Sequence, residues 1–161
     1  MHKLAIAAIA IALLALAGGK VAGTLRASDG ATVVRVVDGD TVVVRAGGRE
    51  ERVRYIGVDT PESVKPGTRV QCFGKAAAAA NRRLVAGERV RLVGDAEARD
   101  RYGRRLAYVY RTRDGLFVNA ELVRRGYAKP LMIRPNVAHA AELRRLAVSA
   151  RRARLGLWSR C

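Results

Sequence analysis

Three short β-prone runs follow one another in residues 32–56, and they constrain the fold of this chain more than any other feature of its sequence. Residues 32–37, 41–45 and 51–56 are rich in valine, threonine and other residues that pack well on a pleated strand. The last two runs are separated by Ala46-Gly47-Gly48, which is typical of a tight turn. The simplest interpretation is a β-meander.

Two more strands and three helices are predicted downstream. Residues 89–93 alternate basic and apolar side chains, and residues 106–112 repeat the β-branched and aromatic pattern. Residues 71–86 have no helix breaker after Gly74 and should form a helix that ends at Gly87. Residues 118–126 and 138–155 favour a short and a long amphipathic helix. Five strands and three helices fit a small barrel, in a mainly β member of the α+β class.

The length of 161 residues is that of one domain, and its first residues resemble an export signal. Met1-His2-Lys3 is basic, residues 4–14 are an uninterrupted apolar run, and Ala15-Leu16-Ala17 is a small-x-small cleavage site. A retained membrane anchor is the alternative, but the run is shorter than the roughly 20 residues of a spanning helix. We expect a signal peptide over residues 1–17, a short linker over 18–30 and the folded domain over 31–161. The product would be exported to the periplasm, the cell surface or the medium.

The chain contains two cysteines, Cys72 and Cys161. Export predicts an oxidising compartment, where an even pair tends to be joined, so an internal disulfide is expected. Two unpaired thiols, or an intermolecular link through Cys161, are the alternatives.

The charge is strongly positive, with 31 lysines and arginines against 14 aspartates and glutamates and a formal net charge of +17. Such a field favours polyanions, nucleic acid above all. The alternative is a merely solvated basic surface, because an arginine-rich composition also follows from codon bias.

Two acidic stretches stand at the ends of the β-prone runs. Asp38-Gly39-Asp40 alone is more often a structural turn than a site. Asp59-Thr60-Pro61-Glu62 is more unusual, since a strand delivers the aspartate and Pro61 stiffens the exit. Two strand-end carboxylates with a backbone carbonyl suit the flexible oxygen shell of calcium better than zinc, which the two histidines of the chain also disfavour.

Two arginines accompany these acids. Arg54 lies near the end of the third predicted strand, and Arg104 follows a Tyr-Gly turn. Any single arginine of so basic a chain is more often solvated than catalytic. Together, however, the acidic stretches and the two guanidinium groups indicate metal-assisted chemistry on phosphate.

The order and spacing of six motifs resemble the thermonuclease, or staphylococcal nuclease-like, family over about residues 31–158. They are Val-Asp-Gly-Asp-Thr at 37–41, Val-Arg-Tyr-Ile-Gly-Val-Asp-Thr-Pro-Glu at 53–62, Phe-Gly-Lys-Ala at 73–76, Asp-Arg-Tyr-Gly-Arg-Arg-Leu-Ala-Tyr at 100–108, Val-Asn-Ala-Glu-Leu-Val-Arg-Arg-Gly at 118–126 and Gly-Leu-Trp-Ser at 156–159. The resemblance implies an OB-fold barrel of five strands with three helices.

The resemblance also implies roles for individual residues. Asp40 and Asp59 would bind Ca²⁺ through carboxylates, and Thr60 through its backbone carbonyl. Glu62 would act as general base or position the attacking water, and Arg54 and Arg104 would grip the phosphate and neutralise charge in the transition state.

Tyr102 matches a family tyrosine that contacts the bound nucleotide, although a tyrosine capping the barrel edge is nearly as good an interpretation. The main departure from the family follows Lys129, where Pro130-Leu131-Met132-Ile133 replaces a segment with tyrosines that line the nucleotide pocket.

The sequence therefore predicts an exported, calcium-dependent nuclease that hydrolyses DNA and RNA, prefers single-stranded or flexible regions and leaves 3′-phosphate ends. The alternative is a non-catalytic OB-fold module that binds single-stranded nucleic acid. We expect a monomer without a stable protein partner, and no membrane association once the signal is cleaved.

Overall fold

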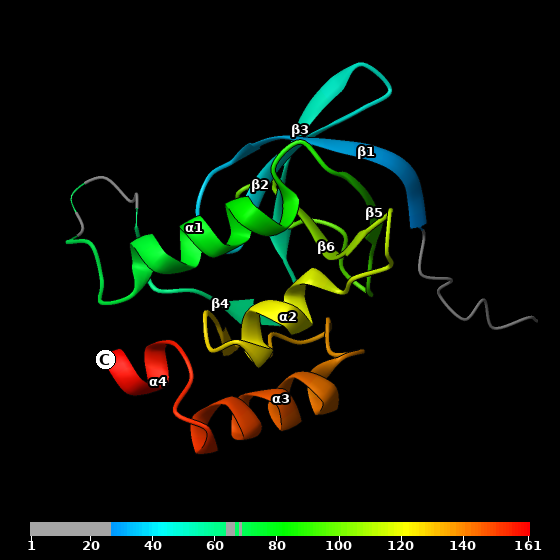
Figure 1. The fold of residues 1–161 in the computed structure, drawn as a ribbon. Coiled ribbons are helices and arrows are strands. Elements are labelled where there is room, and N and C mark those ends of the chain that lie inside the picture. The colour runs from blue at the N-terminus through cyan, green and yellow to red at the C-terminus, as the bar shows by residue number, and fades with distance from the viewer. Residues whose placement is uncertain (1–26, 64–66, 68) are drawn as a thin grey trace, which may run out of the picture.

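A closed five-stranded barrel forms the upper half of the protein in the computed structural model, which describes residues 27–63, 67 and 69–161 (Figure 1). Its strands are β1 (Ala27–Val36), β2 (Thr41–Ala46), β3 (Arg49–Tyr55), β5 (Arg89–Val93) and β6 (Arg105–Arg111), in the order β1-β2-β3-β6-β5. The predicted signal peptide, residues 1–17, lies outside the described residues.

The barrel closes through one parallel pair. β1, β2 and β3 form the predicted antiparallel meander, and β5 pairs antiparallel with both β1 and β6. β3 and β6 run parallel, with Arg54 opposite Leu106. The segment between these two strands, which contains helix α1, must therefore cross over before the chain returns beside β3.

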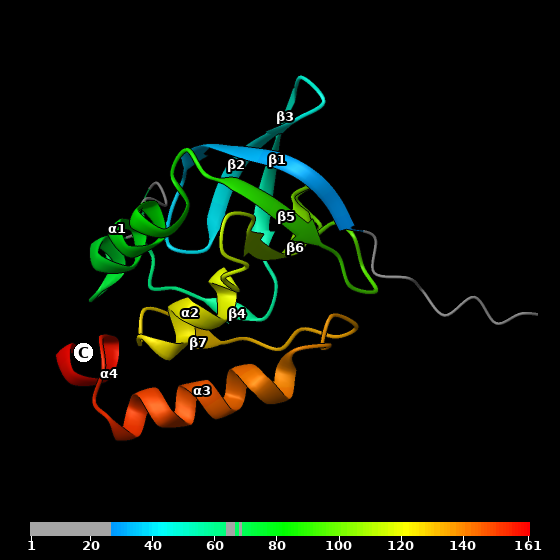
Figure 2. The same cartoon turned by 45° about the vertical axis from the view of Figure 1, so that its right-hand side comes forward.

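The described residues also form four helices: α1 (Gly74–Val85), α2 (Val118–Arg124), α3 (Ala140–Arg152) and the single turn α4 (Leu157–Arg160). α1 covers one side of the barrel, and α2 lies between the barrel and α3 (Figure 2). A two-stranded sheet of β4 (Val58–Asp59) and β7 (Lys129–Pro130) joins the barrel to this helical layer.

The core runs from the barrel interior into the helical layer. Val42, Val44, Val53, Val90 and Leu92 fill the barrel and are fully buried. Leu122 of α2 and Leu143 of α3 belong to the same continuous cluster. Burial of these side chains, at about 25 cal/mol per Å² of apolar surface, drives the packing of the helices onto the barrel.

The predicted fold class is confirmed, with shifts at the ends of the elements. β1 begins at Ala27, five residues before the predicted run, and pairs there with Val93 of β5. α1 starts at Gly74 rather than residue 71. β4, β7 and α4 are too short to leave a periodic pattern and were not predicted. Within residues 27–63, 67 and 69–161, no helix is long and apolar enough to span a bilayer.

Cys72 and Cys161 are joined by a disulfide, with their Cα atoms 5.9 Å apart. The bond connects the approach to α1 with the last residue of the chain, across a sequence separation of 89 residues. It therefore fastens the C-terminal α4 to the barrel side of the molecule, as the expected internal pairing requires.

Candidate active site

Asp40 lies at the start of β2, at the open end of the barrel. Its carboxylate is nearly buried and accepts hydrogen bonds from the backbone N–H and the hydroxyl of Thr60, both at 2.8 Å. Gly39 makes this approach possible, because a Cβ there would lie 2.6 Å from the Thr60 hydroxyl oxygen. The Asp-Gly-Asp turn and the Asp-Thr-Pro-Glu segment, which are about 20 residues apart in sequence, thus meet directly.

Arg54 links the two acidic stretches. The antiparallel register of β2 and β3 sets it opposite Thr41, so its guanidinium reaches both carboxylates. One terminal nitrogen contacts Asp40, and the other donates to Asp59 at 3.1 Å. The Arg54 side chain is only 15% exposed, whereas that of Asp59 is 54% exposed. The mostly buried guanidinium of Arg54 is therefore held between the buried carboxylate of Asp40 and the accessible carboxylate of Asp59.

Glu62 is held in a loop between β4 and α1 by its backbone. Its N–H donates to the side-chain oxygen of Gln71, and its carbonyl accepts from the Gln71 N–H, both at 2.9 Å. Gly74 packs against this loop so closely that a Cβ would lie 2.4 Å from the Glu62 carbonyl oxygen. One oxygen of the Glu62 carboxylate accepts from the Ser63 N–H at 2.9 Å.

Arg104 is positioned by Asp100. Its Nε donates to one Asp100 oxygen at 2.7 Å, while the backbone N–H groups of Tyr102 and Arg104 donate to the other oxygen at 2.9 and 3.0 Å. Burial alone would raise the pKa of Asp100, but the hydrogen bonds from Arg104 and Tyr102 outweigh it and lower that pKa. Arg104 directly precedes β6, which runs parallel to β3 with Leu106 opposite Arg54, and the two arginines line the same cavity.

These side chains surround a small cavity of about 170 Å³. All six residues predicted from the sequence to form the catalytic and metal-binding set line it, together with Asp38, Thr41 and Pro61; the six are Asp40, Arg54, Asp59, Thr60, Glu62 and Arg104. The structure thus brings together residues that span more than 60 positions of the chain.

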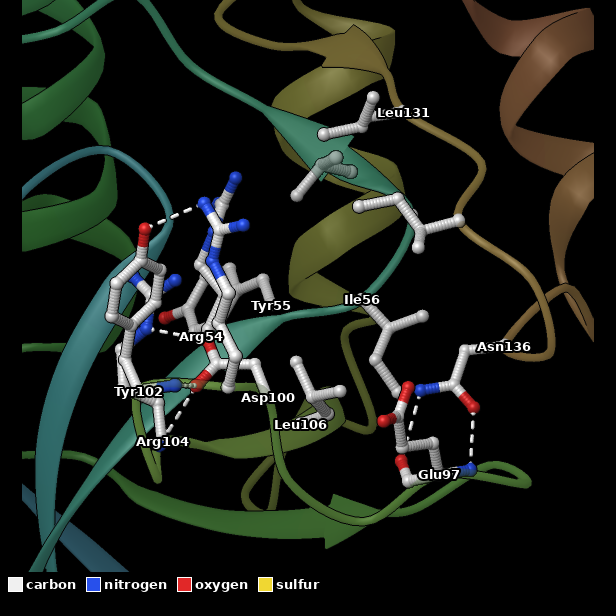
Figure 3. A pocket seen from close by; sticks show the side chains of 14 residues that line it. Arg54, Tyr55, Ile56, Glu97, Asp100, Tyr102, Arg104, Leu106, Leu131 and Asn136 are labelled. Atoms are coloured by element: carbon white, nitrogen blue, oxygen red, sulfur yellow. Dashed lines mark hydrogen bonds and ion pairs between the residues drawn. The ribbon is translucent and has the colours of Figure 1, made fainter.

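A larger cavity of about 450 Å³ adjoins the small one and shares Arg54 and Arg104 with it. Figure 3 shows Arg54, Asp100, Tyr102 and Arg104 gathered at one end and Glu97 and Asn136 at the other, with Ile56 and Leu106 between them. Leu131 and Ile133, from the segment where the sequence departs from its family, also line this cavity. It therefore offers a cationic end and an apolar wall.

Tyr102 lies at the cationic end of the larger cavity. It is 68% exposed, and the guanidinium of Arg101 lies 4.8 Å and that of Arg104 5.4 Å from its ring centre. Its hydroxyl accepts a hydrogen bond from Arg101 at 2.7 Å. The side chain is thus open to a ligand in the cavity, and it does not cover the barrel core.

The carboxylates concentrate negative charge. Burial, followed by the neighbouring charge of Asp40, raises the pKa of Asp38 to about 6. Burial also raises the pKa of Asp59, although Arg54 acts in the opposite direction. Burial thus disfavours the ionised form of both carboxylates, and a cation bound beside them would favour it.

The donor atoms of the site suit a hard cation. Asp40, Asp59 and Thr60 offer only oxygen, and the first two already share the positive charge of Arg54 between them. Among the residues that the structure describes, no three acidic, histidine or cysteine side chains converge as a metal-binding group. The chemistry of the donors fits a metal such as calcium, and Arg54 provides the positive charge in the structure described here.

Two supporting residues escaped the sequence analysis. Asn81 of α1 is fully buried, accepts from the Tyr55 hydroxyl at 3.0 Å and donates to the Asp38 carbonyl at 2.9 Å. It thereby holds the turn that carries Asp40. Asp100, which positions Arg104, belongs to the motif at 100–108, but the sequence assigned it no role of its own. An asparagine inside an alanine-rich helix was the only available signal for Asn81.

The chain belongs to the staphylococcal nuclease homologue family, whose model matches residues 52–160. That range contains every predicted catalytic, metal-binding and substrate-binding residue except Asp40. The chain is 43% identical to the thermonuclease of Staphylococcus intermedius over 128 residues, which cover 80% of this chain and 75% of the relative. It is 39% identical to the thermonuclease of Staphylococcus hyicus, covering 79% and 74%, and 38% identical to endonuclease YncB of Bacillus subtilis, covering 80% and 61%.

Proposed function

We propose that this protein is an exported, calcium-dependent nuclease that hydrolyses phosphodiester bonds of DNA and RNA. One observation carries the proposal: Arg54 and Arg104 stand at the border between a small carboxylate-lined cavity and a larger cavity with an apolar wall. A phosphate at that border would face both guanidinium groups, with its nucleoside on the apolar side. The thermonuclease and endonuclease relatives support the same activity.

In the proposed reaction, Glu62 orients a water molecule in the small cavity and accepts its proton. The water oxygen bonds to phosphorus as the bond from phosphorus to the 5′-oxygen breaks, and the departing 5′-oxygen takes a proton from solvent water to become a hydroxyl. The products are a 3′-phosphate end and a 5′-hydroxyl end. Arg54 and Arg104 stabilise the charge that gathers on the phosphoryl oxygens.

A Ca²⁺ ion held by Asp40, Asp59 and the Thr60 carbonyl would supply Lewis acidity toward the phosphate when bound. The residues of the chain do the positioning: Thr60 fixes the Asp40 carboxylate with two hydrogen bonds, and Gln71 fixes the backbone of Glu62.

A substrate in single-stranded or flexible form is favoured by the shape of the site. The phosphate must reach Arg54, whose side chain is only 15% exposed, so the neighbouring bases have to separate from a stacked duplex. Export and a monomeric state complete the proposal; the basic first residues, the apolar run over 4–14 and the small-x-small site that follows support export.

The test is the release of acid-soluble nucleotides from single-stranded DNA with Ca²⁺, with Mg²⁺ and with chelator. We expect hydrolysis with Ca²⁺ that the chelator abolishes. Glu62→Gln and Arg104→Ala should each lower the rate on the order of 100-fold or more. The matched controls are Glu50→Gln and Arg45→Ala, which alter an exposed ion pair on the β2–β3 hairpin and should retain full activity.

If the wild-type protein binds single-stranded DNA but does not cut it with Ca²⁺, with Mg²⁺ or with chelator, the alternative of a non-catalytic OB-fold binding module is established. Equal hydrolysis with and without chelator would instead exclude the metal-dependent reaction.

A further inference from the structure

The outer face of α3 carries a stripe of arginines. Leu143, Ala147 and Ala150 face α2 and are buried. At 3.6 residues per turn, the opposite side of the helix presents a set of exposed residues. They are Arg144, Arg145, Val148, Arg151 and Arg152.

This charge is not neutralised locally. Among the described residues, Arg144, Arg145 and Arg152 make no ion pair with a carboxylate. The only acid on α3 is Glu142, which pairs with His139 at 3.0 Å. On α2, by contrast, the exposed Arg124 pairs with Glu121 three residues before it. The stripe on α3 therefore keeps a concentrated positive field.

Contacts through Trp158 connect this face of α3 to the strand β7, which lies beside the candidate active site. The Lys129 ammonium lies 5.8 Å, and the Arg151 guanidinium 5.7 Å, from the ring centre of Trp158. Lys129 is paired with Asp59 across the β4–β7 sheet. Trp158 thus links the strand beside the site to the last turn of α3, and both views show α4 next to that end of α3 (Figures 1 and 2).

We propose that Lys129, Trp158 and the arginine face of α3 form a track that binds the phosphates of a nucleic-acid strand outside the catalytic cavity. This inference rests on the proposed nuclease function and names a second contact with its substrate. The guanidinium groups present paired donors that match phosphate oxygens, and the continuity through Lys129 places them where a strand leaving the site on the Asp59 side would pass.

The track makes affinity depend on strand length. An oligonucleotide that fills only the catalytic cavity cannot reach α3, whereas a long strand contacts both. Each phosphate contact with a single strand contributes about −0.7 to the slope of log affinity against log salt concentration. Loss of three contacts should therefore reduce that slope by about 2.

The experiment uses the full chain with two charge-matched triple variants. The track variant combines Arg144→Gln, Arg145→Gln and Arg152→Gln. The control combines Arg35→Gln, Arg49→Gln and Arg52→Gln, exposed residues of β1 and β3 that also lack an ion pair among the described residues. Binding of a long single-stranded DNA and of a dinucleotide is measured from low to high salt in a Glu62→Gln background.

We expect the track variant to lose about tenfold or more in affinity for the long strand, with a slope smaller by about 2, and the control to lose less than threefold. Dinucleotide binding should be the same in both. If both variants lose the same affinity for the long strand, the effect comes from total charge and the track is overturned. If the track variant loses as much affinity for the dinucleotide as for the long strand, the substitutions have damaged the catalytic cavity, and the track is again overturned.

A second arm uses vesicles with anionic lipid. If the track variant loses vesicle binding and keeps its affinity for the long strand, the face binds membranes and the proposal fails. Hydrolysis of the dinucleotide, measured in the same triple variants with Glu62 intact, reports the nuclease function separately from the track.

Discussion

The guanidinium of Arg104, the proposed phosphate ligand, is held in place by Asp100. One oxygen of Asp100 accepts hydrogen bonds from the backbone N–H groups of Tyr102 and Arg104, and the other accepts from Arg104 Nε. One carboxylate therefore both shapes the turn and orients the Arg104 side chain. Arg54 is held in the same manner by Asp40 and Asp59.

We predict that Asp100→Asn separates these two tasks. An asparagine oxygen can still accept the backbone N–H groups, but its amide nitrogen cannot accept from Arg104 Nε. The turn should persist while Arg104 moves, so kcat/KM for single-stranded DNA should fall between about 10-fold and 100-fold. The free energy of unfolding should change little, as measured with urea.

Asp114→Asn is the matched control, because Asp114 also holds an arginine, Arg111, but lies outside both cavities. It should leave kcat/KM intact. Full activity of Asp100→Asn would show that Arg104 needs no positioning by this carboxylate.

α2 is a short helix that serves as a core element. Val118–Val123 are all buried, although one of them is an asparagine and another a glutamate. Asn119 accepts from the Val109 N–H at 3.0 Å and donates to the Ile56 carbonyl at 2.8 Å, and so ties the helix to the strand ends beside the site. Glu121 is bound by the two arginines that follow it.

We predict that Glu121→Gln destabilises the protein by about 2 kcal/mol at pH 7, because a buried carboxylate loses charge-assisted hydrogen bonds. The hydrogen bonds from Arg124 lower the pKa of Glu121 below its ordinary value of 4.5. Its contribution is therefore present above about pH 4.5 and is lost as the pH falls through the lowered value. Urea unfolding at several pH values should show the difference between variant and wild type shrinking in acid.

Glu50→Gln provides the comparison for this stability measurement. Its exposed pair with Arg45 should contribute under about 1 kcal/mol at any pH. An equal effect of the two substitutions would mean that burial of Glu121 is unimportant.

Across the whole molecule, the barrel and the C-terminal helices share one core. The disulfide joins the segment before α1 to the last residue of the sequence. Cys72 directly follows Gln71, the residue that binds the Glu62 backbone, and Cys161 follows α4. The bond thus connects the loop that carries Glu62 to the last residue of the sequence.

We predict that Cys72→Ser combined with Cys161→Ser lowers the free energy of unfolding by about 4 kcal/mol, since the bond closes a long loop in the unfolded chain. Urea unfolding of the wild type with reductant should match that of the variant, and reductant should not affect the variant. If the free energies of unfolding of the oxidised wild type and the variant differ by less than about 1 kcal/mol, loop closure by the disulfide does not reduce the conformational entropy of the unfolded chain appreciably.

Much of the fold followed from local patterns. The strand runs, the alanine-rich helix and the two later helices were all predicted within a few residues, because each buries one face with its own periodicity. β4, β7 and α4 were not, since elements of two to four residues exist only through their partners. A helix was predicted over residues 138–155, but α3 spans Ala140–Arg152, and Ala153, which directly follows it, is exposed.

The sequence by itself determined the type of each residue at the site, the family and the order of the elements, because these depend on local composition and on motif spacing. Only the tertiary structure decided that Arg54 bridges Asp40 and Asp59, that Arg54 and Arg104 line one cavity, and that Trp158 links Lys129 to α3. Such contacts join residues distant in sequence, and their geometry arises when the barrel closes and the helices pack against it.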